Sequence, residues 1–553
     1  MEARAEKEDR VTVEADAAQP YWMGSSGTTP PTKEVALPPL VQLAFPNVAA
    51  CSVELTTDDH EAISHYRTSF SKLYHTKNPR YSLFSVMLLV AERSQMAMHM
   101  ILALSGSEVD RRRGRQDTAM QISTRKSRAL YHYSMALRLM ADVVGQAAAE
   151  PRGGGMDLDC VLTALYLMLL YEQMFGSRQG LSHHLAGAAI IVQHHCAHLV
   201  APWLRAPRGE KGLGGGDGGG SIMPPGRRQQ QLAFSQTAQP GSEPQMSQYS
   251  SRLLARLALS DAAATSYGIG GEVISALYDV MGLRLGGNDT PSLDSLETIS
   301  SLDRYADTLY RNVWGESYPP AELADDVENR PVFSFFCAIL QLRFLLSQRS
   351  KTLTPPDPAA AGDYPAGAAA AAANAECLAG VHDTVQAVGA RFADVLAAAA
   401  ALSLSSDGSR RLVANLRFVV PHYHAVVLEL RRLTAAAAGR RVAGGLGLAP
   451  DGPQREALQG IMGLAVQAFR HEGDEAMLRI AQPLFMVALE TDDVLHREWV
   501  LERFEGLGRF GARFERARAF LVKTIDRQQA LGRRVDVLEQ FRREGGNPAI
   551  FVF

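Results

Sequence analysis

Histidines gather in the middle of the chain, and their spacing could place two of them on one metal ion. Within sixteen residues lie His183, His184, His194, His195, Cys196 and His198. His194 and His198 are one helical turn apart, so both could bind one Zn²⁺ ion. No carboxylate or cysteine pair accompanies them, the His-Glu-x-x-His pattern is missing, and the pair His422 and His424 is weaker still. Histidines on the polar face of an amphipathic helix explain the same spacing, so we predict no metal and no other cofactor in this chain.

Pairs of aspartates could hold Mg²⁺ against a diphosphate, as an all-α enzyme of the isoprenoid type would require. The chain has three such pairs, Asp58-Asp59, Asp325-Asp326 and Asp492-Asp493. None continues as Asp-Asp-x-x-Asp or Asp-Asp-x-x-Glu, because the fifth position holds Ala62, Asn329 and His496, respectively. Helix caps and solvated turns account for all three pairs. The isoprenoid-type enzyme is therefore only the third alternative.

Glycine-rich segments and nucleophile motifs give no further basis for catalysis. The run Gly212–Gly220 lacks the Lys-Ser or Lys-Thr that completes a phosphate loop, and Gly268–Gly271 does not follow a predicted strand. No serine stands in a Gly-x-Ser-x-Gly elbow, and no cysteine has the histidine context of a nucleophile. We therefore predict no catalytic residue and no enzymatic activity.

A short basic cluster is the one strongly charged feature of the sequence. It consists of Arg111, Arg112, Arg113 and Arg115, with Arg125 and Lys126 further on. Such a cluster is typical of a nuclear-import signal or of a contact with phosphate. A solvated loop between two helices would have the same composition, so both interpretations stay open.

Apolar residues recur at steps of three and four through most of the chain, which predicts helices that position these side chains. We expect them from Thr57 to Tyr74 and at Leu83–Leu104, Tyr131–Met140, Leu158–Phe175, Leu181–Leu199, Leu253–Tyr267, Leu302–Trp314, Val332–Leu346, Glu376–Leu402, Gln454–Arg470, Asp474–Glu490, Asp493–Phe504 and Arg513–Leu531. Sustained two-residue alternation and Asn-Gly hairpins are absent. The predicted fold class is all-α, with irregular helix packing.

Composition predicts one large domain between tails. Residues 1–50 are charged and then Pro-, Ser- and Gly-rich, so we expect a disordered tail. The domain is predicted at 51–540, followed by a tail at 541–553. Flexible low-complexity insertions are expected at about 205–249, 351–373 and 435–453.

Charge and cysteine usage limit the class of protein. The net charge of −3 excludes a polybasic nucleic-acid coat, and the five scattered cysteines indicate a reducing compartment rather than a disulfide scaffold. The first ten residues contain no apolar signal region. The longest dense apolar stretch, Val161–Tyr171, is about half of the ~20 residues that a membrane span needs. We expect a soluble intracellular protein without a membrane partner.

Five segments, in order, resemble the fungal-specific transcription factor domain, the helical regulatory region of fungal binuclear zinc-cluster regulators. They are His65-Tyr66 with Asn78-Pro79 and Ile101–Ser105; Leu162–Glu172 with His184–Ala188; Leu253–Leu257 with Asp261–Ala263; Pro483–Ala488; and His496–Leu501. The second is similar to the family's apolar helix ending in Tyr-Glu, followed by a His-Leu-x-Gly-Ala helix start. The resemblance covers about residues 55 to 540.

This resemblance implies a nuclear, non-enzymatic transcription regulator that is controlled by a small effector or a partner protein. It also implies transcriptional partner proteins or a homodimer. The family's DNA-reading module needs six closely spaced cysteines that bind two zinc ions, and this chain lacks them. DNA is therefore expected to be contacted only indirectly or through a module absent from this chain.

A ligand pocket between helices is a further expectation. Leu165, Met168 and Phe175 could line a site for an apolar ligand, although a tight core would use the same residues. The alternative to a transcription regulator is a helical interaction scaffold without a transcriptional role.

Overall fold

Helices make up 85% of the residues that the computed structural model describes, and no strand occurs among these residues. The described residues are 51–74, 76–113, 119–149, 156–196, 234, 246–283, 293–353, 365–437 and 452–543. The all-α prediction is therefore confirmed. All of them belong to one compact unit, Pro46–Phe553. The predicted tail at 1–50 lies outside the described residues.

The first half of the unit contains α1 to α11. Their bounds are α1 (Thr57–His65), a π-helical turn (Tyr66–Phe70), α2 (Ser71–Tyr74), a 3₁₀ turn (Pro79–Tyr81), α3 (Leu83–Ala91), α4 (Gln95–Arg113), α5 (Ala119–Ala149), α6 (Leu158–Met174), α7 (Arg178–Ile191), a second π-helical turn (Val192–Cys196), α10 (Gln248–Ala264), a 3₁₀ turn (Thr265–Tyr267) and α11 (Glu272–Val280).

The second half contains α12 to α23. Their bounds are α12 (Leu293–Tyr305), α13 (Leu309–Trp314), a 3₁₀ turn (Gly315–Ser317), α14 (Pro320–Thr352), α15 (Pro365–Arg391), α16 (Ala393–Ala400), α17 (Arg411–Ala437), α18 (Gly452–Glu472), α19 (Asp474–Arg479), α20 (Ala481–Glu490), α21 (Val494–Leu507), a 3₁₀ turn (Gly508–Phe510), α22 (Ala512–Leu531) and α23 (Val537–Arg543).

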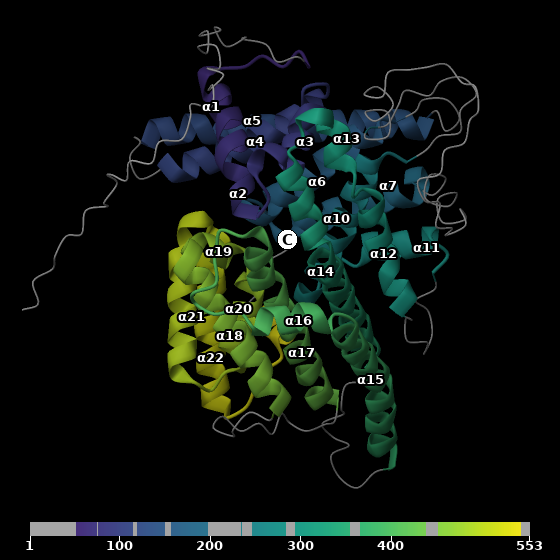
Figure 1. Cartoon of the computed structure of the whole chain (residues 1–553), viewed down its shortest axis with the longest axis vertical. Coiled ribbons are helices and arrows are strands. Elements are labelled where there is room, and N and C mark those ends of the chain that lie inside the picture. Colours follow the sequence, from purple (N-terminus) through teal and green to yellow (C-terminus); the bar gives the residue numbers. More distant parts are fainter. Residues whose placement is uncertain are drawn as a thin grey trace, which may run out of the picture. The chain divides into compact units, whose positions relative to one another are not determined.

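Helix α6 is the central helix of the first half and packs against α4, α7 and α10 (Figure 1). Every residue of α6 except Glu172 is buried. Asp157 caps the helix, because its Oδ1 accepts a hydrogen bond from the backbone N–H of Cys160 at 3.2 Å. The predicted helix Leu158–Phe175 is thus confirmed, since a helix that is apolar on all sides is buried on all sides.

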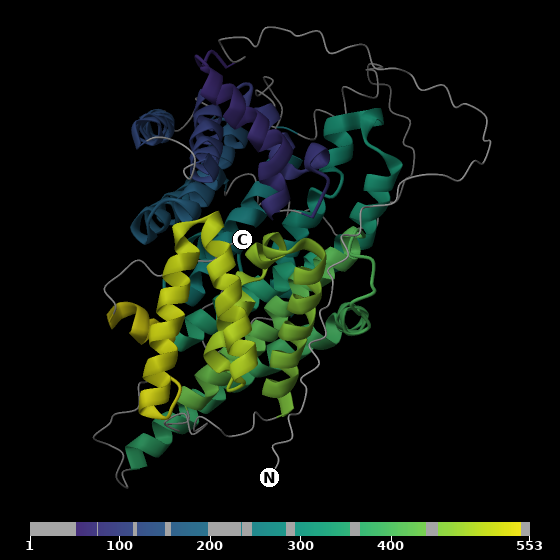
Figure 2. The same ribbon diagram turned by 90° about the vertical axis from the view of Figure 1, so that its left-hand side faces the viewer.

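Helix α17 has the same role in the second half, where it packs against α14, α18 and α20. Helices α17, α18, α20, α21 and α22 lie side by side in both views (Figures 1 and 2). No helix was predicted at 411–437, because Pro421 interrupts the apolar pattern. In the structure Pro421 lies inside the helix without ending it.

Several predicted helices are divided in the structure. The span Leu83–Leu104 is two helices, because Ser94 begins a new one: its Oγ accepts a hydrogen bond from Ala97 N at 3.3 Å. Leu302–Trp314, Glu376–Leu402 and Asp474–Glu490 are also divided into two helices each, but without a side-chain cap at the break. The apolar periodicity of the sequence continues across these breaks, because the two helices that flank a break bury the same face.

The predicted insertions fall largely outside the described residues. At their edges the structure is helical: α10 begins at Gln248, α15 includes residues 365–373, and α17 extends to Ala437.

Helix α14 is long and apolar enough to cross a membrane, judged by length and composition alone, with a mean hydropathy of 1.4 over 18 residues. In the structure 72% of that window is buried inside the protein. The core helix of a soluble protein has the same properties, so this one helix is weak evidence for a membrane span.

Candidate functional site

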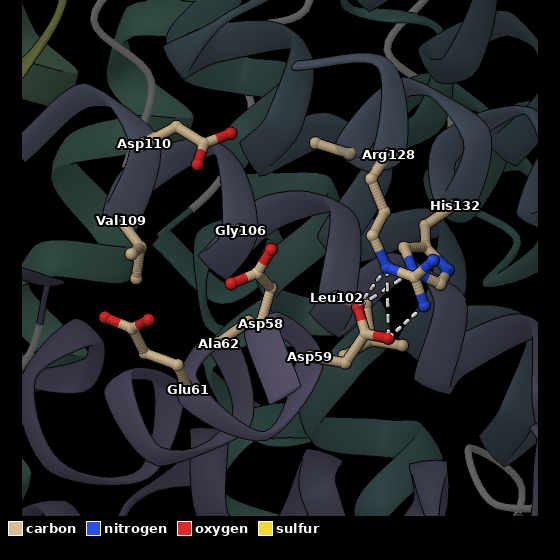
Figure 3. Close-up of a pocket in the computed structure, with 11 residues that line it drawn as sticks. Asp58, Asp59, Glu61, Ala62, Leu102, Gly106, Val109, Asp110, Arg128 and His132 are labelled. Carbon is tan, nitrogen blue, oxygen red and sulfur yellow. Dashed lines mark hydrogen bonds and ion pairs between the residues drawn. The ribbon is translucent and has the colours of Figure 1, made fainter. Parts of the chain in front are cut away.

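A pocket lined by both charged and apolar residues lies between α1, α4 and α5 (Figure 3). It is lined by Asp58, Asp59, Glu61, Ala62, Leu102, Gly106, Val109, Asp110, Arg128, Ala129 and His132. Of its four carboxylates, that of Asp59 is bound by Arg128 and His132 and that of Glu61 is paired with Arg113. Among the lining residues that the structure describes there is no serine, threonine or cysteine.

Asp59 connects the helices on one side of this pocket. At the start of α1 its Oδ2 accepts hydrogen bonds from the backbone N–H and the hydroxyl of Thr56, each at 2.8 Å, which forms a capping box. From α5, Arg128 Nε donates to Oδ1 at 2.9 Å, and His132 Nε2 lies 3.1 Å from the same oxygen. Figure 3 shows both side chains at the Asp59 carboxylate. These contacts fix α5 against the start of α1.

His132 also forms a hydrogen bond with His99 of α4. The Nδ1 atoms of the two rings are 2.8 Å apart, and both side chains are buried. If neutral His132 donates a hydrogen bond from Nε2 to Asp59, its Nδ1 must accept a hydrogen bond from the Nδ1–H group of His99. The contacts therefore define one tautomer for each ring.

The pKa values of this cluster follow from burial and from hydrogen bonding. Burial raises the pKa of Asp59, but hydrogen bonds from His132, Arg128 and Thr56 lower it more, so it lies well below its usual range. Burial and the neighbouring His132 lower the pKa of His99 to about 4. Near neutral pH, Asp59 is thus ionised and His99 is uncharged.

The residues predicted to line an apolar pocket lie elsewhere. Leu165 and Met168 are buried in α6, with 3% and 0% exposure. Phe175 directly follows α6 and packs on Tyr171, with ring centroids 5.6 Å apart. All three contribute to the continuous core, and none of them lines the pocket between α1, α4 and α5.

A second polar cluster joins α5, α6 and α7 around Glu172. Tyr133 Oη donates to Glu172 Oε1 at 2.5 Å and lies 2.7 Å from His184 Nε2. The backbone N–H of Ser177 donates to Glu172 Oε2 at 2.8 Å. Burial raises the pKa of Glu172, but the hydrogen bonds from His184, Tyr133 and Ser177 outweigh it, so the net shift is downward.

Two glycines leave room for the Glu172 carboxylate. A Cβ atom at Gly176 would lie 1.9 Å from Glu172 Oε2, and one at Gly180 would lie 2.3 Å from the same atom. Gly176, between α6 and α7, and Gly180, in the first turn of α7, are therefore part of the cluster, because any larger residue would displace the carboxylate.

The predicted basic cluster is folded onto carboxylates at the end of α4. Arg111 and Arg112 both contact Glu108, whose side chain is fully buried, and Arg113 pairs with Glu61. Arg115 lies outside the described residues. The side chains of Arg112 and Arg113 remain 42% and 41% exposed, so part of the cluster faces solvent.

Of the histidine pair in the metal hypothesis, His194 and His198, the structure describes only His194. His183 and His194 are exposed, whereas His184 contacts Tyr133. His422 is buried, with Nε2 3.0 Å from the carbonyl oxygen of Arg479. Among the described residues, no group of three or more His, Cys, Asp or Glu side chains could hold a metal ion. His198 lies outside them.

The explanation of the aspartate pairs as caps and solvated turns is wrong for one pair. Asp59 and Asp493 do cap α1 and α21. Asp326, however, lies within α14 and accepts hydrogen bonds from Lys77 Nζ at 2.6 Å and from Arg411 Nη1 at 2.7 Å. Its carboxylate therefore neutralises buried cations from two distant segments of the chain.

Lys77 is the buried cation of that cluster. Its side chain is 3% exposed, and its Nζ donates to Tyr318 Oη at 2.7 Å and lies 4.8 Å from the centre of the Tyr310 ring. Burial and the nearby Arg411 lower its pKa, against the opposite effect of Asp326 and Glu322. Nothing in the local sequence marks this lysine, because its partners lie more than 200 residues further along the chain.

Comparisons with protein-family models, with curated proteins and with solved structures found no match. The resemblance to the fungal-specific transcription factor domain therefore rests on the five segments given above.

Proposed function

We propose that the chain is the all-α regulatory region of a fungal transcription regulator. It receives a signal from a small ligand or a partner protein, acts in the nucleus, and contacts DNA only through a partner or a module absent from this chain. The observation that carries the proposal is the ordered series of five segments along an all-α chain.

The contacts of the second segment support this proposal. Its two parts, the Tyr-Glu end of α6 and the His-Leu-x-Gly-Ala residues in the middle of α7, meet through Tyr133, which contacts both Glu172 and His184. A glutamate and a histidine separated by a glycine turn thus have a shared structural role. Such a role explains why these residue types occur at this spacing.

A reporter assay tests the proposal. The full chain is fused to a neutral DNA-binding module in a fungal cell, and transcription of a reporter with that module's site is measured. We expect output that differs from that of the module alone, in either direction. Output equal to that of the module alone would favour the interaction scaffold.

The interaction scaffold is favoured by one specific observation. On α5 the apolar side chains of Leu130, Tyr131 and Leu137 are 56%, 52% and 36% exposed. Exposed apolar residues on one helix are typical of a surface that binds another protein. Purification of the tagged chain from fungal nuclei and from cytoplasm would show in which compartment its partners are found.

A further inference from the structure

Arg513, at the start of α22, is a buried cation without a carboxylate partner. The residue is 3% exposed, and among the described residues no carboxylate oxygen lies within 4.0 Å of its guanidinium. Its contacts are a long hydrogen bond of 3.5 Å from Nη1 to the carbonyl oxygen of Gln173 and the ring of Phe514, whose centre lies 4.6 Å from the guanidinium. A buried charge without a counter-ion is costly.

Arg111, at the end of α4, adds a second guanidinium with a spare donor. Its Nη2 is 2.6 Å from both carboxylate oxygens of Glu108, and its Nε is 3.1 Å from Oε2. Its Nη1 is buried and has no hydrogen-bond partner among the described residues; the same holds for Nε of Arg513. The guanidinium of Arg111 also lies 5.9 Å from the ring of Phe510, which immediately precedes α22.

The charges around these two arginines do not balance. Glu108 accepts hydrogen bonds from Arg112 as well as from Arg111. Tyr74 and His65, the other titratable side chains whose charges are coupled to this group, are both uncharged near neutral pH, since burial raises the pKa of Tyr74 to about 12 and lowers that of His65. Within the part of the chain that the structure describes, three guanidiniums therefore share the carboxylate of Glu108.

A cation at the end of α4 is expected, because arginines there stabilise the negative end of the helix. That effect does not account for Arg513, which comes from another helix and is more deeply buried. Ordered water could accept the spare hydrogen bonds, but water would leave the excess positive charge unchanged.

We propose that Arg111 and Arg513 bind a small oxyanion, namely the carboxylate or phosphate group of a small molecule, where α4 meets the start of α22. Arginine forks match the geometry of both groups, and one anion would satisfy the spare donors and reduce the excess charge. The side chain of Arg111 is 19% exposed and that of Arg112 is 42% exposed, so the cluster is open to solvent at its rim. This site does not depend on the proposed function.

Thermal unfolding of the full chain tests the proposal. The melting temperature is measured in sodium phosphate, in sodium succinate and in sodium chloride at equal ionic strength. We expect a saturable rise in phosphate, in succinate or in both, because binding to the folded state at ten times Kd favours folding about 11-fold. If the melting temperature rises only in phosphate, the site binds a phosphate group. If it rises only in succinate, the site binds a carboxylate, and if it rises in both, the site accepts either group.

Variants separate binding from the general effect of salts on stability. The rise should be lost in Arg513→Met and in Arg111→Met and kept in Arg516→Met, which changes an exposed arginine on the same helix. If Arg513→Met does not fold, two other measurements decide whether the anion binds at this site. These are the melting temperature of Arg111→Met and the calorimetric titration of wild type with phosphate and with succinate. Equal rises in wild type and in Arg111→Met, or no rise and no heat of binding with either anion, would overturn the proposal.

Discussion

At the scale of single residues, Asp59 connects α1 to α5, because it completes the capping box of α1 and binds Arg128 and His132 of α5. We predict that Asp59→Asn lowers the free energy of unfolding by about 2–3 kcal/mol, since it removes the charge that Arg128 and His132 contact. Chemical denaturation at pH 7 measures this loss. The control is Asp58→Asn at the exposed neighbouring position, for which we expect a change within about 0.5 kcal/mol. Equal effects of the two variants would contradict the role of Asp59.

The pH dependence of that contribution follows from the lowered pKa of Asp59. The folded-state value lies below the unfolded value of about 3.9. The stabilisation is therefore complete above about pH 4 and is lost as the pH falls through the folded-state value. Wild type should lose more stability on acidification below pH 4 than Asp59→Asn does.

Asp261 should have the opposite dependence on pH. It is buried in α10 and accepts a hydrogen bond from Ile274 N at the start of α11, at 2.9 Å. Burial raises its pKa to about 7, despite that hydrogen bond. Because the folded state then binds the proton more tightly than the unfolded state does, Asp261 makes the free energy of unfolding fall as the pH rises from about 4 to about 7.

Urea denaturation at pH 5 and pH 8 tests this prediction. Asp261→Asn should lose less stability between the two pH values than wild type, whereas Asp279→Asn, at an exposed position of α11, should behave like wild type. A wild-type difference that persists unchanged in Asp261→Asn would assign the titration to other groups.

At the scale of elements, the turn between α6 and α7 depends on the absence of a side chain at Gly180. Alanine normally stabilises a helix relative to glycine by about 1 kcal/mol. Here we predict that Gly180→Ala destabilises wild type by about 1–2 kcal/mol, because its Cβ would lie 2.3 Å from Glu172 Oε2. In a Glu172→Ala background the same change should be neutral or stabilising. A double-mutant cycle by chemical denaturation measures this coupling, and additive effects would contradict the packing.

A helix that is buried on all sides can be predicted from the sequence, whereas the ends of helices with uneven burial cannot. The apolar run of α6 predicts a buried helix and its approximate ends. The breaks at Ser94 and before α16 were missed, because apolar periodicity continues on both sides of them. Helix α17 contains Pro421, and a proline inside a helix usually kinks or ends it, so the sequence pattern does not predict this helix.

The clusters could not be predicted from local patterns, because their members are distant in sequence. His132 is 73 residues from Asp59, and Arg513 is 340 residues from Gln173. Sequence indicates that Asp59 can cap a helix and that Arg111 is basic, but it does not indicate which residues they meet. Zinc and aspartate motifs are recognised by the regular spacing of their residues in the sequence. The polar clusters of the structure are instead assembled by tertiary contacts between distant residues.

At the scale of the whole molecule, the segment after α2 is fixed to α14 and α17. Lys77 contacts Tyr318 and Asp326, and Thr76 Oγ1 donates to Asn415 Oδ1 at 2.6 Å. We predict that Lys77→Ala lowers the free energy of unfolding by about 1–3 kcal/mol, because the partly buried carboxylates of Glu322 and Asp326 lose this cation, while Asp326 keeps Arg411. Chemical denaturation measures it, and Lys72→Ala at an exposed position should change stability by less than about 0.5 kcal/mol. A loss for Lys77→Ala as small as that of the control would contradict the importance of this contact.

The central claim is that the folded chain itself regulates transcription. The most direct test compares reporter output from the neutral DNA-binding module alone, from its fusion to the full chain, and from a fusion carrying Leu167→Asp, which places a charge at a fully buried position of α6. With equal protein levels, we predict that the wild-type fusion changes output and that Leu167→Asp returns it to that of the module. Output from the wild-type fusion that equals that of the module alone would contradict the claim.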